Sequence, residues 1–465
     1  MRYTTDMTKG NEFKHIITFA LPMLAGNLFQ QLYNIVDSII VGRFLGSDAL
    51  ASVGATGSIT YFFYTLCIGL AMGTGILISQ RFGAGDHMAV KKYISNSAYV
   101  LGVFGVVISL LSVMATPFLL TMLKTPAEIF DASVGYMRIS CAGTIAVVAY
   151  NWINAIMRSL GDSKTPLVFL VIASVLNVGL DLLFVVAFEM GVNGAALATI
   201  MAQGVSAIGS IIFAFAKNPM FKLDKETLKF DHRYALKCAS TGIPIALQNA
   251  LVSVSMIYLQ SVANSFGKTV VAAYTATMRV EQLVHQPFSS LNAAISAFAG
   301  QNVGAGKRER VITGYKRSMM AGVVFALILL VFFGLFSESI IGVFVDKAET
   351  VEINGELVNI GAEVVSIGAM ALKISACFYI FLGFIHVTRG LLNGAGDVRY
   401  ALINGIAEVV GRIGFAAILV HIPETGYFAV WGTTCLTWVL TGVMSFVRYK
   451  SGAWEKYSLK SATEK

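Results

Sequence analysis

The chain has 465 residues, of which 56% are hydrophobic and 13% are charged. Soluble proteins carry about 25% charged residues, so this composition lacks the charged surface that a water-soluble chain needs and indicates a protein that faces hydrocarbon. It excludes a disordered chain, a collagen-like fibre and a disulfide-stapled secreted domain. The net charge of +8 follows from membrane topology and does not indicate binding to nucleic acid.

Apolar stretches of spanning length follow one another along the whole chain, with short polar turns between them. Only helices and closed barrels can span lipid, and runs of about 20 apolar residues without strict alternation indicate helices. The sequence therefore predicts an all-α polytopic membrane protein with twelve transmembrane helices, at residues 16–41, 52–80, 94–118, 134–157, 167–188, 195–216, 240–263, 271–300, 318–345, 364–388, 400–420 and 427–447.

Lys and Arg residues are distributed unevenly over the predicted loops. If both termini lie in the cytoplasm, the cytoplasmic segments hold nearly all of them, and the outer loops hold Arg43, Lys124, Lys268 and Lys347. Cytoplasmic loops carry an excess of Lys and Arg in membrane proteins. We therefore expect a multi-pass protein of a prokaryotic cell membrane with both termini in the cytoplasm, and with the acidic stretch 346–363 outside.

The two halves of the chain repeat each other. The Leu-Pro pair that ends at Pro22 has a counterpart, Ile-Pro, that ends at Pro244, and the Gln-x-x-Gly-Ala-Gly turn that begins at Gln80 returns at Gln301. Because six helices precede the repeat, both halves have the same orientation, related by a pseudo-twofold axis along the membrane normal. Two such bundles leave a cleft between them.

These repeats divide the chain into two pseudo-symmetric six-helix lobes. We expect an N-lobe at residues 1–216, a basic cytoplasmic linker at 217–238, and a C-lobe with a cytoplasmic tail at 239–465.

Polar residues form stripes along four predicted helices of the first lobe. In the first helix, Gln30, Tyr33, Asn34 and Asp37 follow the spacing i, i+3, i+4, i+7 and share one face. Helices four, five and six add pairs about one turn apart. The simplest arrangement directs all of them at one cavity, and the further members are Asn151, Asn154, Asn177, Asp181, Thr199 and Gln203.

Two carboxylates, Asp37 and Asp181, belong to these stripes. A like-charged pair in a low-dielectric site can take up a proton near neutral pH. Carboxylate, amide and hydroxyl oxygens could instead hold Na⁺, because hard cations prefer oxygen ligands; Asp37, Asn177, Asp181 and Thr199 are the candidate ligands. The alternative for the carboxylates, and for each amide taken singly, is a hydrogen bond that joins helices.

The polar residues of the second lobe form a less clear pattern along the predicted helices. Glu281 and His285 lie one turn apart and are a candidate second-lobe proton site. Glu408 and Arg412 are also one turn apart, and their spacing favours a neutralised structural pair.

Pro22 lies inside the first predicted helix, on the N-terminal side of the polar stripe. Proline removes one backbone hydrogen bond and kinks a helix. The kink is either static or a hinge that bends when the charge of the same helix is neutralised.

Two motifs match the signature of an enzyme family but do not lie in the structural setting that the enzyme requires. Gly83-Ala-Gly-Asp86 and Gly394-Ala-Gly-Asp397 match the GxGD of intramembrane aspartyl proteases, but both lie in short basic turns and read as helix-terminating glycines. The sequence contains no P-loop, no HExxH and no GxSxG. We therefore expect a non-enzyme without a cofactor, driven by an ion gradient.

Taken together, these motifs resemble the multidrug and toxic compound extrusion (MATE) family over essentially the whole chain. The resemblance is carried by the twelve spans in two lobes, the paired Gln-x-x-Gly-Ala-Gly turns, and the Leu-Pro opening followed by Leu-Tyr-Asn-Ile-Val-Asp37. The first lobe is most similar to the DinF-like branch. That likeness implies ion-coupling roles for Asp37, Tyr33, Asn177, Asp181 and Thr199, and cavity roles for Asn151, Asn154 and Gln30.

The resemblance implies export of organic, often cationic, amphiphiles against H⁺ or Na⁺, by a monomer in the lipid bilayer. The NorM-like branch implies further acids in spans seven and ten, which this sequence lacks. A lipid-linked oligosaccharide flippase of the same superfamily is the main alternative, and it should have a more cationic cavity. An intramembrane protease is the alternative from a different class.

Overall fold

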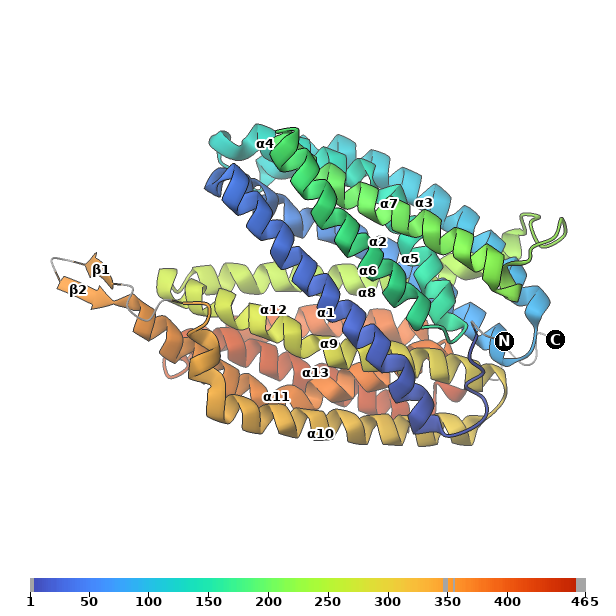
Figure 1. Cartoon of the computed structure of the whole chain (residues 1–465). Helices are drawn as coiled ribbons and strands as arrows, with labels where there is room; N and C mark the ends of the chain where they lie inside the picture. Colours follow the sequence, from blue (N-terminus) through green and yellow to red (C-terminus); the bar gives the residue numbers. More distant parts are fainter. Residues whose placement is uncertain (1–3, 346–349, 354–355, 457–465) are drawn as a thin grey trace.

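The computed structural model describes residues 4–345, 350–353 and 356–456. In these ranges the chain is almost entirely helical (Figure 1). The first half contains α1 (Glu12–Leu45), α2 (Ser47–Gly83), α3 (His87–Met122), α4 (Ala127–Ala142), α5 (Thr144–Ser159), α6 (Lys164–Asp181), the π-helical turn η1 (Leu182–Ala187) and α7 (Gly191–Lys217). A short 3-10 helix, η2 (Pro219–Phe221), follows α7.

The second half contains α8 (His232–Asn264), α9 (Lys268–Gly304), α10 (Arg308–Ile341), α11 (Ile360–Ala395), α12 (Val398–Leu419), η3 (Gly426–Phe428) and α13 (Ala429–Lys450). The prediction of twelve spanning helices in two lobes is confirmed. The fourth span consists of α4 and α5, which are bent by 43° at their junction, and the fifth consists of α6 continued by η1.

Two of the twelve spans differ from the others in composition. Among the described residues, nine helices are long and apolar enough to cross a membrane, and the bent pair α4–α5 makes a tenth. The remaining two, α1 and α9, have 34 and 37 residues. They are long enough to span lipid, but polar side chains interrupt their apolar surface.

The two lobes separate toward one end of the molecule and meet at the end where both termini lie (Figure 1). Helix α1 runs diagonally, so that its first half lies against α9 and α10 of the second lobe and its last turns lie beside α6 of the first. Glycines permit the close contact of the lobes, because a Cβ at Gly69 or Gly73 would lie 2.3 Å from the Cα of Ala246 or Gly242.

A small hairpin departs from the all-helical expectation. Strands β1 (Thr350–Ile353) and β2 (Glu356–Asn359) pair antiparallel between α10 and α11, with Thr350 opposite Asn359. It falls within the predicted acidic outer loop 346–363. Lys347, one of the outer basic residues of the prediction, lies outside the described residues.

Candidate functional site

The polar stripes of the first lobe meet around one small cavity. Its volume is about 20 Å³, which is enough for roughly one water molecule. Helix α1 contributes Gln30 and Tyr33, α6 contributes Asn177, and α7 contributes Thr199 and Gln203. Five of the residues predicted from separate stripes are therefore neighbours in space. The prediction missed two polar members of the lining, Tyr150 and Ser174. Helical spacing could have found both, because Tyr150 precedes Asn154 by four positions and Ser174 precedes Asn177 by three.

Asp37 and Asp181 lie next to this group and face each other. Asp181 is fully buried at the last position of α6, and Asp37 lies one turn after Tyr33 on α1. Their carboxyl groups are close enough to interact. When both groups are ionised, neither oxygen of Asp181, nor Oδ1 of Asp37, has a hydrogen-bond donor among the described residues. No described Lys or Arg forms an ion pair with either carboxyl group.

The groups around the two carboxylates present mainly oxygen acceptors. Asn177 donates a hydrogen bond of 3.3 Å to Thr199 Oγ1, which orients its Oδ1 as a free acceptor. The side-chain oxygens of Asn154 and Gln203 are also buried without a partner in the part of the chain that is described. Buried acceptors without donors are unfavourable, so this arrangement suits a species that supplies positive charge or protons, such as H⁺, Na⁺ or an organic cation.

Tyr33 belongs both to the polar stripe of α1 and to the lining of the cavity. Its hydroxyl group contacts the side chains of Gln30 and Gln203, and the two acids are the nearest charges. Gln30 and Asn34 are themselves exposed on the face of α1.

The two asparagines of α5 have different surroundings. Asn151 donates 2.8 Å to the carbonyl of Val147 in its own helix, so its amide nitrogen is satisfied locally. Asn154 is buried and contacts Tyr150 of the cavity lining.

A π-helical turn follows Asp181 directly. Residues Leu182–Ala187 form η1, and the chain then reverses into α7 at Gly191. π-turns in helices are rare and concentrate at functional sites. The turn ends α6 at Asp181, and no sequence pattern indicated it.

The second lobe also has a buried polar group, but its charges are paired. Glu408 accepts from Arg412 at 3.1 Å and from Arg389 at 3.4 Å, and Arg412 is fully buried. Arg412 also donates to Ser255, and Arg389 donates to Asn404 at 2.7 Å. The predicted Glu408–Arg412 pair is therefore present, whereas Arg389, from the end of α11, was not foreseen.

Glu281 and His285 have separate surroundings in this lobe. His285 packs edge-on against His386 and tilts against Trp438, with ring centroids 5.8 and 6.0 Å apart. Glu281 is buried beside Ser375, and its Oε1 has no partner within the described ranges. No hydrogen bond joins Glu281 to His285 in those ranges, and His386 is a neighbour that the helical spacing could not reveal.

Comparison with known proteins agrees with this architecture. The family model MatE matches residues 22–183 and again residues 244–418, one match for each lobe. The chain belongs to the MatE family.

Known members of the family align with this MATE chain over nearly its full length. "Probable multidrug resistance protein YpnP" of Bacillus subtilis is 29% identical over 463 residues, which covers 99% of both chains. A multidrug resistance MATE family transporter of the MOP superfamily, solved in an outward-facing conformation, is 26% identical with a TM-score of 0.86 and covers 97% of this chain and 99% of its own. A MOP superfamily transporter from Pyrococcus furiosus superposes with a TM-score of 0.88, 26% identity and the same coverage. The chain is thus a multi-pass membrane transporter and not an enzyme.

In this MATE transporter, the repeated Gln-x-x-Gly-Ala-Gly turns close the molecule at the end that holds the termini. A Cβ at Gly83 would lie 1.9 Å from the carbonyl oxygen of Gln301, and a Cβ at Gly304 would lie 1.8 Å from that of Gln80. Only glycine permits this symmetric contact of α2 with α9. Gln80 also donates 2.9 Å to the carbonyl of Gly394, in the opposite lobe.

The segment before α1 lies in this closed region and binds to both lobes. The amide of Thr5 donates to the Leu160 carbonyl of the first lobe, at 3.0 Å, and the amide of Met7 donates to Gln301 Oε1, at 2.9 Å. Gln301 in turn donates 3.1 Å to the carbonyl of Ser159 in the first lobe.

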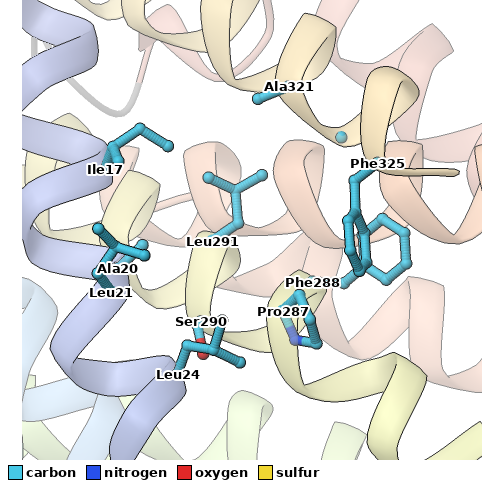
Figure 2. A pocket seen from close by; sticks show the side chains of 11 residues that line it. Ile17, Ala20, Leu21, Leu24, Pro287, Phe288, Ser290, Leu291, Ala321 and Phe325 are labelled. Carbon is cyan, nitrogen blue, oxygen red and sulfur yellow. The ribbon is translucent and has the colours of Figure 1, made fainter. Parts of the chain in front are cut away.

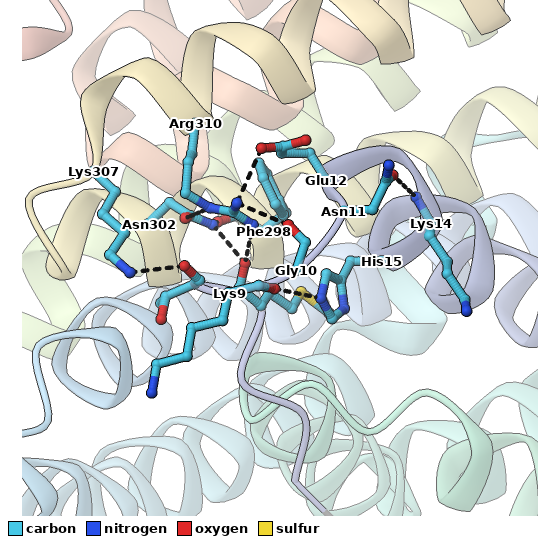
Figure 3. Close-up of polar contacts among 12 residues, drawn as sticks. Lys9, Gly10, Asn11, Glu12, Lys14, His15, Phe298, Asn302, Lys307 and Arg310 are labelled. Carbon is cyan, nitrogen blue, oxygen red and sulfur yellow. Dashed lines mark hydrogen bonds and ion pairs between the residues drawn. The ribbon is translucent and has the colours of Figure 1, made fainter.

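Basic residues of the second lobe complete these contacts, as Figure 3 shows. Lys307 donates to the carbonyl of Thr8 at 2.8 Å, and Arg310 donates to that of Gly10 at 2.8 Å and to Glu12 at 3.0 Å. The repeated turns, which look like loop punctuation in the sequence, are thus part of the contact between the lobes.

Proposed function

We propose that this protein is a secondary active exporter that exchanges organic, often cationic, amphiphiles for H⁺ or Na⁺ by alternating access. The observation that carries the proposal is the pair Asp37 and Asp181, which face each other without a basic partner beside a cavity lined with oxygen acceptors. The names of the relatives, such as the multidrug resistance protein of B. subtilis, support the export of small organic molecules.

Competition for the same negative charge supplies the coupling. Two adjacent carboxylates repel each other in a low-dielectric site, so a bound proton or Na⁺ relieves that repulsion. An organic cation that reaches the same oxygens can do so as well, but both cannot be accommodated at once. The ion therefore favours release of the drug on the outside, and the drug displaces the ion on the inside. Na⁺ would use Asp37, Asn177, Asp181 and Thr199.

We place both termini in the cytoplasm and the protein in a prokaryotic cell membrane, on the strength of the Lys and Arg distribution. With that orientation, the closed end of the molecule is the cytoplasmic end, and the conformation described above opens to the outside.

Inward opening then requires the first half of α1 to leave α9 and α10. Pro22 lies in that half, and Asn27, just after it, donates 3.2 Å to Ser290 of α9. A hinge at Pro22 would let this half move while the acid-bearing half stays in the first lobe. Apart from this hinge in α1, the lobes move as units with the boundaries 1–216 and 239–465, joined by 217–238, and a single chain suffices for the cycle.

The first lobe carries the coupling in this proposal, in agreement with the DinF-like likeness. In the second lobe, Glu408 is paired with Arg389 and Arg412, which favours a structural role for this group. A flippase for lipid-linked oligosaccharides would be expected to present free basic residues toward its cavity, and the first-lobe cavity contains none among its lining residues.

Transport in proteoliposomes tests the proposal. Purified protein is reconstituted, and ethidium movement is followed after a pH gradient or a Na⁺ gradient is imposed separately. We expect one gradient to drive ethidium against its concentration difference, and the Asp37→Asn variant to lose this response while it elutes and melts like the wild type. Wild-type export by Asp37→Asn, or no response of the wild type to either gradient, would refute it.

A further inference from the structure

A second cavity lies between the lobes, on the side of α1 that faces α9 and α10 (Figure 2). Its volume is about 150 Å³, a size at which an apolar cavity in a protein accepts a benzene-sized ligand. Leu21 lines it and is still 58% exposed, so the cavity opens to the surface of the molecule.

The walls of this cavity are apolar. Figure 2 shows Leu21 and Leu24 of α1 opposite Leu291 of α9. The rings of Phe288 and Phe325 are in edge-to-face contact, with their centroids 5.3 Å apart. Ser290 is the one polar side chain in the lining, and its hydroxyl group is already engaged, because it donates 2.8 Å to the carbonyl of Gln286 and accepts from Asn27. A ligand therefore finds no free hydrogen-bonding side chain among the lining residues.

Basic residues lie one turn beyond the cavity, toward the end that holds the termini. Lys14 precedes Ile17 by three positions and Leu21 by seven, so it continues the cavity-lining face of α1. Arg317 precedes Ala321 by four positions on α10 and is 41% exposed.

One acid belongs to the same rim. Glu12 pairs with Arg317 at 3.1 Å and with Arg310 at 3.0 Å. Arg310 lies seven positions before Arg317 on α10 and so away from the rim, but it shares Glu12 with Arg317. Lys14 and Arg317, with the shared Glu12, therefore leave the rim with a net positive charge.

We propose that this cavity holds an acyl chain of an anionic phospholipid from the cytoplasmic leaflet, with the headgroup at Lys14 and Arg317. A void that opens to hydrocarbon loses dispersion contacts until a chain fills it. Basic pockets between helices on the cytoplasmic side attract anionic headgroups. The charge, the apolar lining and the opening together match one molecule that has both a chain and an acidic head.

The inference rests on the proposed orientation, which puts the cavity in the anionic leaflet. Because α1 supplies one wall and α9 and α10 supply the others, a bound chain contacts both sides of the contact that inward opening has to break. The lipid would therefore favour the outward-open state over the inward-open state.

Photo-crosslinking tests the site without any need for transport. The full chain is reconstituted into vesicles of phosphatidylcholine and phosphatidylglycerol, in which one lipid at a time carries a diazirine in its acyl chain, and the labelled peptides are identified by mass spectrometry. We expect diazirine-phosphatidylglycerol to label 17–24 and 321–325 in preference to diazirine-phosphatidylcholine. Equal labelling by the two lipids would overturn the proposal.

Two pairs of variants separate the site from the general lipid contact of the helices. Ala321→Phe fills the cavity and should abolish the preferential labelling. Leu327→Phe, at a 51% exposed residue of the same helix that lies outside the labelled segment, should leave it unchanged. Lys14→Gln and Arg317→Gln should each weaken the preference for phosphatidylglycerol, by about fivefold per charge, whereas Lys316→Gln should not.

Two further outcomes would count against the lipid. Labelling that survives Ala321→Phe would show that the chain lies elsewhere, and competition by ethidium would show that the occupant is substrate. Melting temperature and elution profile confirm that each variant is folded. Because labelling is read without a gradient, a failure here leaves the ethidium result untouched, and the reverse also holds.

Discussion

The two lobes repeat the same helical plan, but Asp37 and Asp181 of the first lobe differ from Glu408 of the second in their partners. In the first lobe, Asp37 and Asp181 face each other, and no described basic side chain pairs with either. In the second lobe, Glu408 lies between Arg389 and Arg412, and all three are held by hydrogen bonds. An acid that is already neutralised by the protein has little reason to bind an ion, whereas an unpaired one does.

This difference assigns the proposed ion exchange to the first lobe, although the two lobes have nearly the same arrangement of helices. Duplicated lobes give two equivalent places for a polar core. The paired core holds helices α8, α11 and α12 together, and the unpaired core is left available for exchange.

Removal of one charge from the unpaired core should abolish coupled transport. In Asp37→Asn and in Asp181→Asn, the remaining carboxylate loses the like-charged neighbour that favours ion uptake, so gradient-driven ethidium export should fall to the level of empty liposomes. The thermal melting temperature should stay near that of the wild type, since neither acid forms an ion pair in the described structure. A large drop in melting temperature with residual export would reverse the assignment.

Removal of one charge from the paired core should instead destabilise the protein. Arg412→Leu leaves Glu408 buried with one partner, and breaking such pairs costs about 3–5 kcal/mol. We expect a clear decrease in melting temperature in detergent. The double variant Arg412→Leu/Glu408→Leu should recover part of the loss, because it removes the uncompensated charge; if both variants melt alike, the pair is not the source of the effect.

The two lobes meet at the repeated Gln-x-x-Gly-Ala-Gly turns. A substitution there should affect the transport cycle without changing the polar group of either lobe. Gly304→Val would place side-chain atoms on the carbonyl oxygen of Gln80, so the closed state at this end should be lost. Transport should fall, and a cysteine introduced at Ala84 should become more reactive toward a polar maleimide. The matched control is Gly102→Val in α3, a helical glycine without a positive φ whose Cβ would meet nothing within 4 Å. Equal effects of the two variants would argue against the contact between the lobes as the cause.

The smallest effect is expected at Glu281 in the second lobe. Glu281→Gln keeps the shape of the side chain and its contact with Ser375, and it removes a charge that the proposed mechanism does not use. Export should stay within about twofold of the wild type, a change below 0.5 kcal/mol. Export that loses its gradient dependence in this variant would add Glu281 to the coupling site and weaken the contrast between the lobes.

The sequence predicted the positions of the helices with little error. It did not predict which residues of other helices they contact. Apolar runs end where polar turns begin, so the predicted spans match helices α1 to α13 apart from the division of α4 from α5 and of α6 from η1. The polar stripes showed which residues share a face of one helix. They contained no information about residues such as Arg389 and His386, which complete their groups from other helices.

Hydrophobic length, charge bias and internal repetition are properties of local segments, so the amino-acid sequence is enough to predict a chain that crosses a membrane twelve times in two related halves. Which acids are unpaired and which are paired depends instead on how helices distant in the chain cross and rotate against each other, and this is visible in the folded molecule alone. The same packing turned two ordinary glycine turns into a contact between lobes, and it created a cavity between α1, α9 and α10 that no single segment encodes.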